Sequence, residues 1–208
     1  MKKNILISSI IIVIAIISLI TYQYFSSFKE VSFSIKQTGL TVDVFKINKD
    51  NNQKINSFSS DTKLSLQNGD YYYIANGEKF DSTHHLFILT NSIKTITIDP
   101  DYSSAYLASV LTAENTAIQA VIESAYPTAI KQYDIFSSQL FQKGEWYGGL
   151  LKYRTSDPND IKDPYRIVMH FENNKWVIIH YPEIVVTKTN DPTVPVEVLN
   201  TVNALLDS

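Results

Sequence analysis

Residues 165–181 read YRIVMHFENNKWVIIHY and predict a β-hairpin. Asn173-Asn174 is expected to form a two-residue turn, because asparagine tolerates the positive φ that such turns require. Placing Glu172 opposite Lys175 lets the two charges pair across the strands. The remaining register then follows as Phe171 opposite Trp176, Met169 opposite Ile178 and Ile167 opposite His180.

This register assigns every side chain of the hairpin to a face, because neighbouring strand residues point to opposite sides. One face carries Ile167, Met169, Phe171, Trp176, Ile178 and His180, and the other carries Val168, His170, Val177, Ile179 and Tyr181. Both faces are largely apolar, so we expect a helix against one and a neighbouring element or a groove against the other. His170 and His180 lie on opposite faces, which excludes a two-histidine metal site there.

The surrounding segments predict an α+β domain over residues 101–208, with a helix packed on a four-stranded antiparallel sheet. Strands at 133–141 and 145–154 precede the hairpin. Before them, Ser103 or Ser104 is expected to cap a short helix ending at Leu111, and Thr112 to cap a second helix ending near Tyr126. After the hairpin, Pro192 and Pro195 predict an extended segment over residues 183–195, which we call the arm. Residues 196–206 then predict an amphipathic helix that packs back on the domain.

Two short pieces of this region carry a resemblance. Residues 144–147 (GEWY) and 174–177 (NKWV) are similar to the strand starts "G-x-W" and "x-G-K-W" of cystatin-like and NTF2-like domains, with Asn174 in place of the usual glycine. The resemblance implies a helix lying across the concave face of the sheet. Because such folds host enzymes as well as binding pockets, no function is carried over from them.

Four aromatic residues are candidates for a ligand or partner cleft in this domain. They are Trp146, Tyr147, Tyr153 and Trp176, whose rings could line a groove for a peptide or a glycan. Packing in the core is the alternative interpretation.

Residues 29–100 show short alternating runs separated by turn residues, which predicts a small antiparallel β-sandwich. Alternation places Tyr71 and Tyr73 on one face of a strand and Tyr72 on the other. His84 and His85 are adjacent and would point to opposite faces, so they could not chelate one ion together. We expect them in a solvated loop.

The segment 64–73 (LSLQNGDYYY) is similar to the "L-x-L-x-x-G-x-Y" pattern of PEGA and carboxypeptidase-regulatory-like domains. The namesake Pro-Glu-Gly-Ala motif is absent, and residues 36–39 (KQTG) stand near its place. The resemblance implies a surface sandwich without catalytic residues.

Residues 4–28 (NILISSIIIVIAIISLITYQYFSSF) contain no charged residue and are long enough to cross a bilayer as a helix. With Lys2 and Lys3 before it, this stretch predicts an uncleaved signal anchor: residues 1–28 form a cytoplasmic stub and a transmembrane helix that contacts the lipid bilayer. The bulk of the chain would then lie outside the cytoplasm of a bacterial cell. A cleaved secretory signal is the alternative.

Composition excludes several classes of function. The 208 residues carry a net charge of −3, which is not typical of a protein that binds nucleic acid. The chain has no cysteine, which excludes disulfides, thiolate metal sites and a cysteine nucleophile. No G-x-S-x-G or phosphate-loop motif is present. Asp157, Asn159, Asp160 and Asp163 lack EF-hand spacing, so an ordinary acidic loop is expected. We predict no catalytic residue, cofactor or metal.

The sequence therefore predicts a single-pass membrane protein whose two outer domains, 29–100 and 101–208, form a non-catalytic binding or structural module. Its partner would be an envelope protein, a peptide or a glycan. The alternatives are an envelope hydrolase and a carrier of lipid or another small ligand. A carrier would require a continuous apolar cavity beneath the helix at 113–125.

Overall fold

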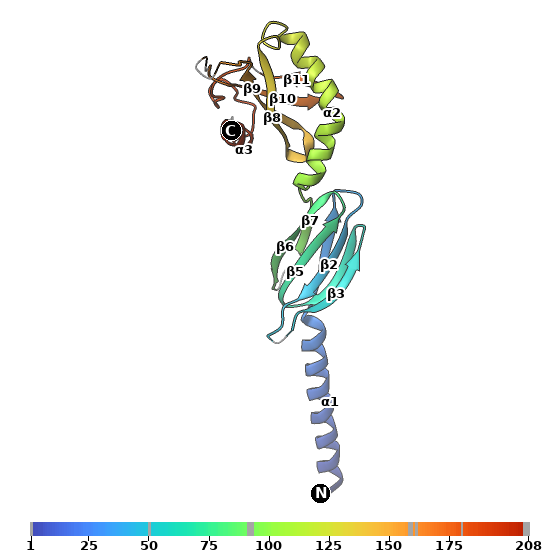
Figure 1. Ribbon diagram of the computed structural model, residues 1–208. Coiled ribbons are helices and arrows are strands. Elements are labelled where there is room, and N and C mark those ends of the chain that lie inside the picture. The colour runs from blue at the N-terminus through green and yellow to red at the C-terminus, as the bar shows by residue number, and fades with distance from the viewer. Residues whose placement is uncertain are drawn as a thin grey trace. The chain divides into compact units, whose positions relative to one another are not determined.

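The computed structural model describes residues 2–49, 51–90, 94–157, 160, 162–179 and 181–205, with side chains in the first helix given for 13–24 and 26. The chain forms two compact units, Met1–Pro100 (unit 1) and Asp101–Ser208 (unit 2). Figure 1 shows a helix followed by a β-sandwich in unit 1, and a mixed helix-and-sheet arrangement in unit 2.

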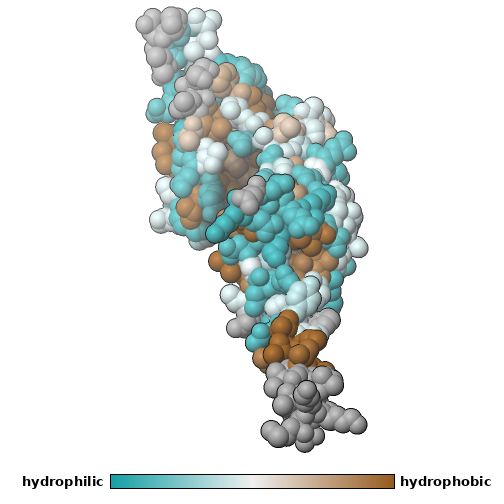
Figure 2. Space-filling view, turned by 90° about the horizontal axis from the view of Figure 1, so that it is seen from below, coloured by the Kyte–Doolittle hydropathy of each residue, from teal (hydrophilic) through white to brown (hydrophobic). Residues whose placement is uncertain are grey.

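The first helix, α1 (Lys2–Ser26), ends two residues before the first strand begins at Phe28. Its described apolar side chains, from Val13 to Tyr24, are exposed, as the brown surface beside the grey residues in Figure 2 shows. Among the residues that the structure describes, however, no helix is long and apolar enough to cross a membrane.

This finding corrects the predicted transmembrane anchor over residues 4–28. It also corrects what was derived from the anchor, namely the single-pass topology, the cytoplasmic N-terminus and the extracytoplasmic location. The first part of the predicted span, residues 4–12, lies outside the described side chains.

In its described part, unit 1 contains two sheets that pack face to face. The first sheet has the strand order β4-β1-β7 and the second β3-β2-β5-β6. The strands are β1 (Phe28–Ile35), β2 (Thr41–Lys46), β3 (Gln53–Phe58), β4 (Thr62–Gln67), β5 (Gly69–Gly77), β6 (Phe80–Leu89) and β7 (Lys94–Ile98).

One pairing in this sandwich differs from the expected antiparallel pattern. β1 lies antiparallel to β4 but parallel to β7, from the pair Val31–Lys94 to the pair Ile35–Ile98. The two strands are far apart in sequence, so the alternating pattern within each strand carries no information about their relative direction. The prediction of an all-antiparallel sandwich is therefore wrong for β7.

Alternation within β5 is confirmed. Tyr71 and Tyr73 are buried between the sheets, and Tyr72 lies on the outer face, where its ring stacks between Phe45 and His84 at centroid distances of 4.8 and 5.5 Å. His84 and His85 do point to opposite faces, since His85 stacks on Tyr73 instead. They belong to β6 and not to a loop. Both faces of the Tyr72 ring are therefore covered by neighbouring rings.

Unit 2 contains one long helix, α2 (Ser104–Ala125), where two helices were expected. Ser103 caps it by accepting a hydrogen bond from the Tyr106 amide at 3.2 Å. Thr112 does not start a second helix, because its hydroxyl donates to the Ala108 carbonyl at 2.9 Å within the continuous helix. Neither proline nor glycine interrupts the segment, so nothing breaks it at that point.

The described sheet of unit 2 has the strand order β11-β10-β9-β8, and all three pairings are antiparallel. Its strands are β8 (Tyr133–Phe141), β9 (Trp146–Tyr153), β10 (Tyr165–Glu172) and β11 (Lys175–Ile178), with a 3-10 turn, η1 (Gln142–Gly144), between β8 and β9.

The predicted hairpin register is confirmed where it is described. Glu172 pairs with Lys175, Phe171 with Trp176, and Met169 with Ile178. Asn173 and Asn174 have φ values of 51° and 60°, as the two-residue turn requires. The pair Ile167–His180 lies outside the described residues because of His180.

The two faces of the sheet contact different elements. On one face, Ile167, Met169 and Trp176 pack with Ile118 and Ile122 of α2. On the other face, Val168 and Trp146 pack with the arm and with the C-terminal helix α3 (Val196–Asn203). The expectation that the last helix packs back on its own domain is confirmed. This arrangement positions the site described below.

Burial on the α2 face has a consequence at high pH. Tyr147 is 1% exposed, and burial raises the pKa of its hydroxyl to about 12. The folded state therefore favours the neutral phenol, and this contribution is complete below pH 10 and is lost as the pH rises from about 10 to 12. Between pH 9 and pH 11, we expect Tyr147→Phe to remove about 1.4 kcal/mol of this stability loss. Urea titrations at pH 9 and pH 11 measure it.

The matched control is Tyr22→Phe, because Tyr22 is 71% exposed. This control should lose as much free energy of unfolding between pH 9 and pH 11 as the unchanged chain does. An equal loss of stability between pH 9 and pH 11 in Tyr147→Phe and in the unchanged chain would contradict the prediction.

Candidate functional site

The four predicted cleft residues do not lie together. Trp146 and Tyr147 are neighbours on β9 and point to opposite faces of the sheet. Trp146 belongs to the α3-side core, and Tyr147 and Trp176 belong to the α2-side core, where their rings meet edge to face at 6.3 Å. All three are less than 9% exposed. They stabilise the two cores and do not line a common cleft.

Tyr153, the fourth, does reach the surface of unit 2. It lines a shallow hollow of about 480 Å³ together with Phe136, Lys152 and Arg154. The cations there already have partners: Lys152 lies over the Phe136 ring at 4.5 Å, and Arg154 Nε donates to Asp134 at 2.7 Å. This hollow therefore offers few free donors to a ligand.

The space beneath α2 is filled by side chains. Ile118, Ile122, Tyr133, Tyr147 and Trp176 are all buried there, and the Trp176 indole donates to Glu114 at 3.1 Å. A carrier would need a continuous apolar cavity in this place, whereas these buried side chains pack against one another. In the described part of the chain, no three His, Asp or Glu residues are grouped to hold a metal, and Asn159 of the predicted acidic loop lies outside it.

A larger hollow than the one at Tyr153 lies elsewhere in unit 2, between the end of β8, the turn η1, the start of α2 and one side of α3. Its volume is about 640 Å³. We call it the corner pocket. It is lined by Asp101, Leu107, Gln139, Leu140, Phe141, Gln142, Lys143, Glu145, Glu197, Val198 and Thr201.

The backbone of η1 forms one wall of the corner pocket in an uncommon conformation. Gln142, Lys143 and Gly144 all have positive φ, at 45°, 60° and 85°. Glycine adopts this region freely, but a glutamine and a lysine there each cost of order 1 kcal/mol. Such strain persists only where the surrounding structure requires it, and it is concentrated at binding and catalytic sites. The corner is therefore a candidate functional feature.

The opposite wall is α3, which one arginine holds in place. Arg166 of β10 donates from Nε to the Val202 carbonyl at 3.1 Å, and from Nη2 to those of Asn203 and Leu205 at 3.1 and 3.4 Å. Its Nη1 donates to Ile184 of the arm. The last carbonyls of a helix have no partner within the helix, and a cation is favoured at that end. Arg166 thus fixes the position of Glu197 and Thr201 in the pocket.

The corner pocket combines an apolar floor with an acidic rim. Leu140 and Val198 are buried at its base, whereas the rim residues Asp101, Glu145 and Glu197 are exposed. Lys143 is the only cation among the lining residues. Gln142 Nε2 donates to Glu197 at 3.5 Å, which connects the two walls. Three carboxylates against one ammonium favour a cationic ligand.

Sequence reasoning did not identify this pocket. Gln142 and Glu197 are 55 residues apart, and no spacing rule brings them together. The predicted strands at 133–141 and 145–154 leave a short connection between them, but glutamine is not a residue type that indicates a positive φ there.

The comparisons with known proteins add no relative: no protein-family model, no curated protein and no solved structure matches this chain. The resemblances to PEGA and to cystatin-like or NTF2-like domains stay predictions from sequence.

Proposed function

We propose that this protein is a non-catalytic binding module whose corner pocket takes a lysine or arginine side chain of a partner polypeptide. The observation that carries this proposal is the combination of apolar floor and acidic rim. Lysine and arginine have an apolar stem and a charged head, so the stem can cover Leu140 and Val198 while the head meets Glu145 and Glu197.

The alternative of a hydrolase has less support. General acid and base catalysis depends on carboxyl groups whose surroundings shift their pKa, usually through burial. The rim carboxylates of the corner pocket are exposed to solvent. They are suited to attract and orient a cation, and a partner bound in this way would be recognised through charge and shape.

Binding should depend on the rim charges. We expect Glu145→Gln with Glu197→Gln to weaken binding of a hexa-arginine peptide to the full chain about tenfold, because two favourable charge contacts are lost. Isothermal titration calorimetry at two salt concentrations measures the loss and its reduction by screening.

Two controls separate the pocket from net charge. Glu78→Gln with Asp81→Asn makes the same charge change on exposed residues of unit 1 and should leave the affinity unchanged. Thr201→Trp changes no charge but fills the pocket from the exposed side of α3, so it should weaken binding as the double variant does. Equal losses for both charge variants, with no effect of Thr201→Trp, would contradict the proposal.

A further inference from the structure

The outer edge of β6 lacks the features that keep sheet edges from pairing with other chains. β6 is the terminal strand of its sheet and pairs with β5 on one side. In the described part of unit 1, no strand is hydrogen-bonded to its other side. A free edge of this length is a template for another strand unless charge, proline or a bulge blocks it.

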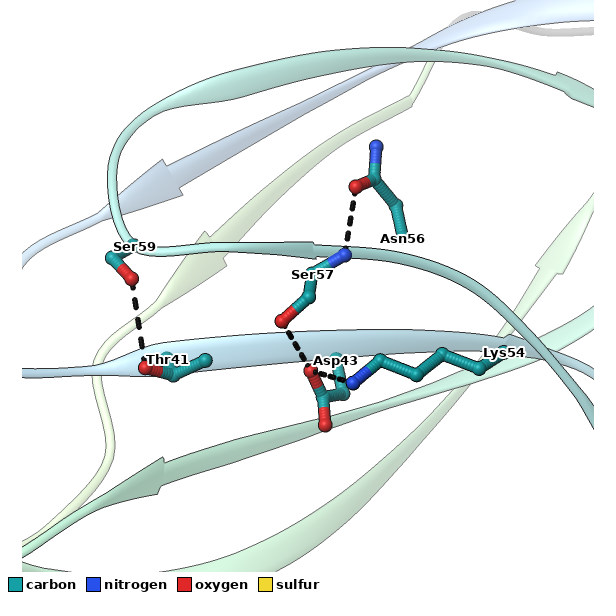
Figure 3. A network of polar contacts seen from close by, with 6 residues as sticks. All are labelled: Thr41, Asp43, Lys54, Asn56, Ser57 and Ser59. Atoms are coloured by element: carbon teal, nitrogen blue, oxygen red, sulfur yellow. Dashed lines mark hydrogen bonds and ion pairs between the residues drawn. The ribbon is translucent and has the colours of Figure 1, made fainter.

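The other described edge strands of both units are blocked by charge. Each carries a charged residue: Lys54 on β3, Lys63 on β4, Lys94 on β7, Asp134 on β8 and Lys175 on β11. Figure 3 shows the β3 edge, where Lys54 is held 2.7 Å from Asp43 of β2 and Ser57 donates to the same carboxylate. β6 carries one charged residue, Asp81, at its start, where its pairing with β5 is irregular between the pairs Gly77–Phe80 and Ala75–Thr83. The rest of the strand, from Ser82 to Leu89, has no charged residue and no proline.

Two large apolar side chains of β6 are exposed beside its free edge. Leu86 is 77% and Ile88 63% exposed on the outer face of the sheet, next to His84. This surface continues inward over Tyr72 and Ile74 of β5, which are partly buried. A strand added at β6 would satisfy its backbone groups and cover these side chains.

We propose that β6 pairs antiparallel with β6 of a second copy of this chain, with Leu86 of one copy opposite Leu86 of the other. Directly opposed residues of an antiparallel pair lie on the same face, so this register also places His84 opposite Ile88, and His85 opposite Phe87. No charged residue lies between Ser82 and Leu89, so the two paired strands bring no charges together in this stretch. The arrangement has a two-fold axis and therefore closes as a dimer.

Cysteine substitution tests the register directly, because the chain contains no cysteine. Leu86→Cys would place the two Cα atoms about 5 Å apart across the axis, within the range that a disulfide spans. Ile88→Cys is nearly as exposed, but its two copies would be about 14 Å apart along the strands. We expect mild oxidation of the full chain to cross-link Leu86→Cys at least about tenfold faster than Ile88→Cys.

A second variant keeps the test independent of position 86. The double variant His84→Cys with Ile88→Cys should cross-link as fast as Leu86→Cys, because position 84 of one copy lies opposite position 88 of the other. Neither single variant should cross-link at this rate. Association through another surface, such as the exposed side chains of α1, would make the variants react alike. Equal rates, or no cross-linking of Leu86→Cys, would overturn the proposal.

Discussion

Replacing Arg166 with lysine is expected to destabilise unit 2 by about 3 kcal/mol and to release α3 from the sheet. The guanidinium reaches four carbonyl groups in two segments, the arm and the C-terminal end of α3. A lysine ammonium is a single point of charge and cannot span them, so the part-buried carbonyls of Asn203 and Leu205 lose this donor. Loss of such partners costs more than the bonds themselves contribute.

Hydrogen exchange of the α3 amides, together with urea unfolding, measures this effect. Because α3 supplies Glu197, Val198 and Thr201 to the corner pocket, the same variant should lose most of its affinity for hexa-arginine. Arg154→Lys is the matched control, since Arg154 makes an exposed ion pair with Asp134 and should change stability by no more than about 0.5 kcal/mol. Unchanged protection of α3 in Arg166→Lys would show that apolar packing alone holds the helix.

The second large effect is expected at Gly148, on the side of β9 that faces α3. A β-carbon at this position would overlap the Val202 side chain and lie 3.0 Å from the Phe141 ring. The position is buried, so the added atom has no free space, and Gly148→Ala should cost about 2–3 kcal/mol by pushing α3 away.

A double variant shows whether the effect of Gly148→Ala comes from this clash or from the reduced conformational freedom of the backbone at residue 148. Val202→Ala removes the atoms that the new methyl group would meet, so Gly148→Ala with Val202→Ala should be at least about 1 kcal/mol more stable than the sum of the single changes implies. Thermal unfolding of the four chains completes the cycle. Additive effects would mean that the methyl group is accommodated without moving α3.

The hairpin of unit 2 shows what local sequence can determine. Two asparagines that accept a positive φ set the turn, and a period of two residues then assigns each side chain to a face. The register from Met169–Ile178 to Glu172–Lys175 followed from these two rules alone. The prediction that each face needs a covering element followed from the apolar character of both.

Other features depend on residues that are distant in sequence. The parallel pairing of β1 with β7, and the contact of Arg166 with carbonyls 36 to 39 residues later, leave no periodic pattern in the sequence. Thr112 was misread because a threonine hydroxyl can cap a new helix or bond back within an existing one. The aromatic residues proposed for a cleft were assigned by type, and alternation along β9 separates Trp146 from Tyr147.

The parallel pair in unit 1 has a mechanical consequence. The chain enters the sandwich through β1 and leaves it through β7, and the two strands run in the same direction along the five pairs from Val31–Lys94 to Ile35–Ile98. Tension between residues 28 and 98 therefore pulls the strands along their length in opposite directions. All five pairs bear the load together, whereas tension across an antiparallel hairpin such as β10–β11 separates its pairs one after another. Unit 1 is thus built to resist stretching.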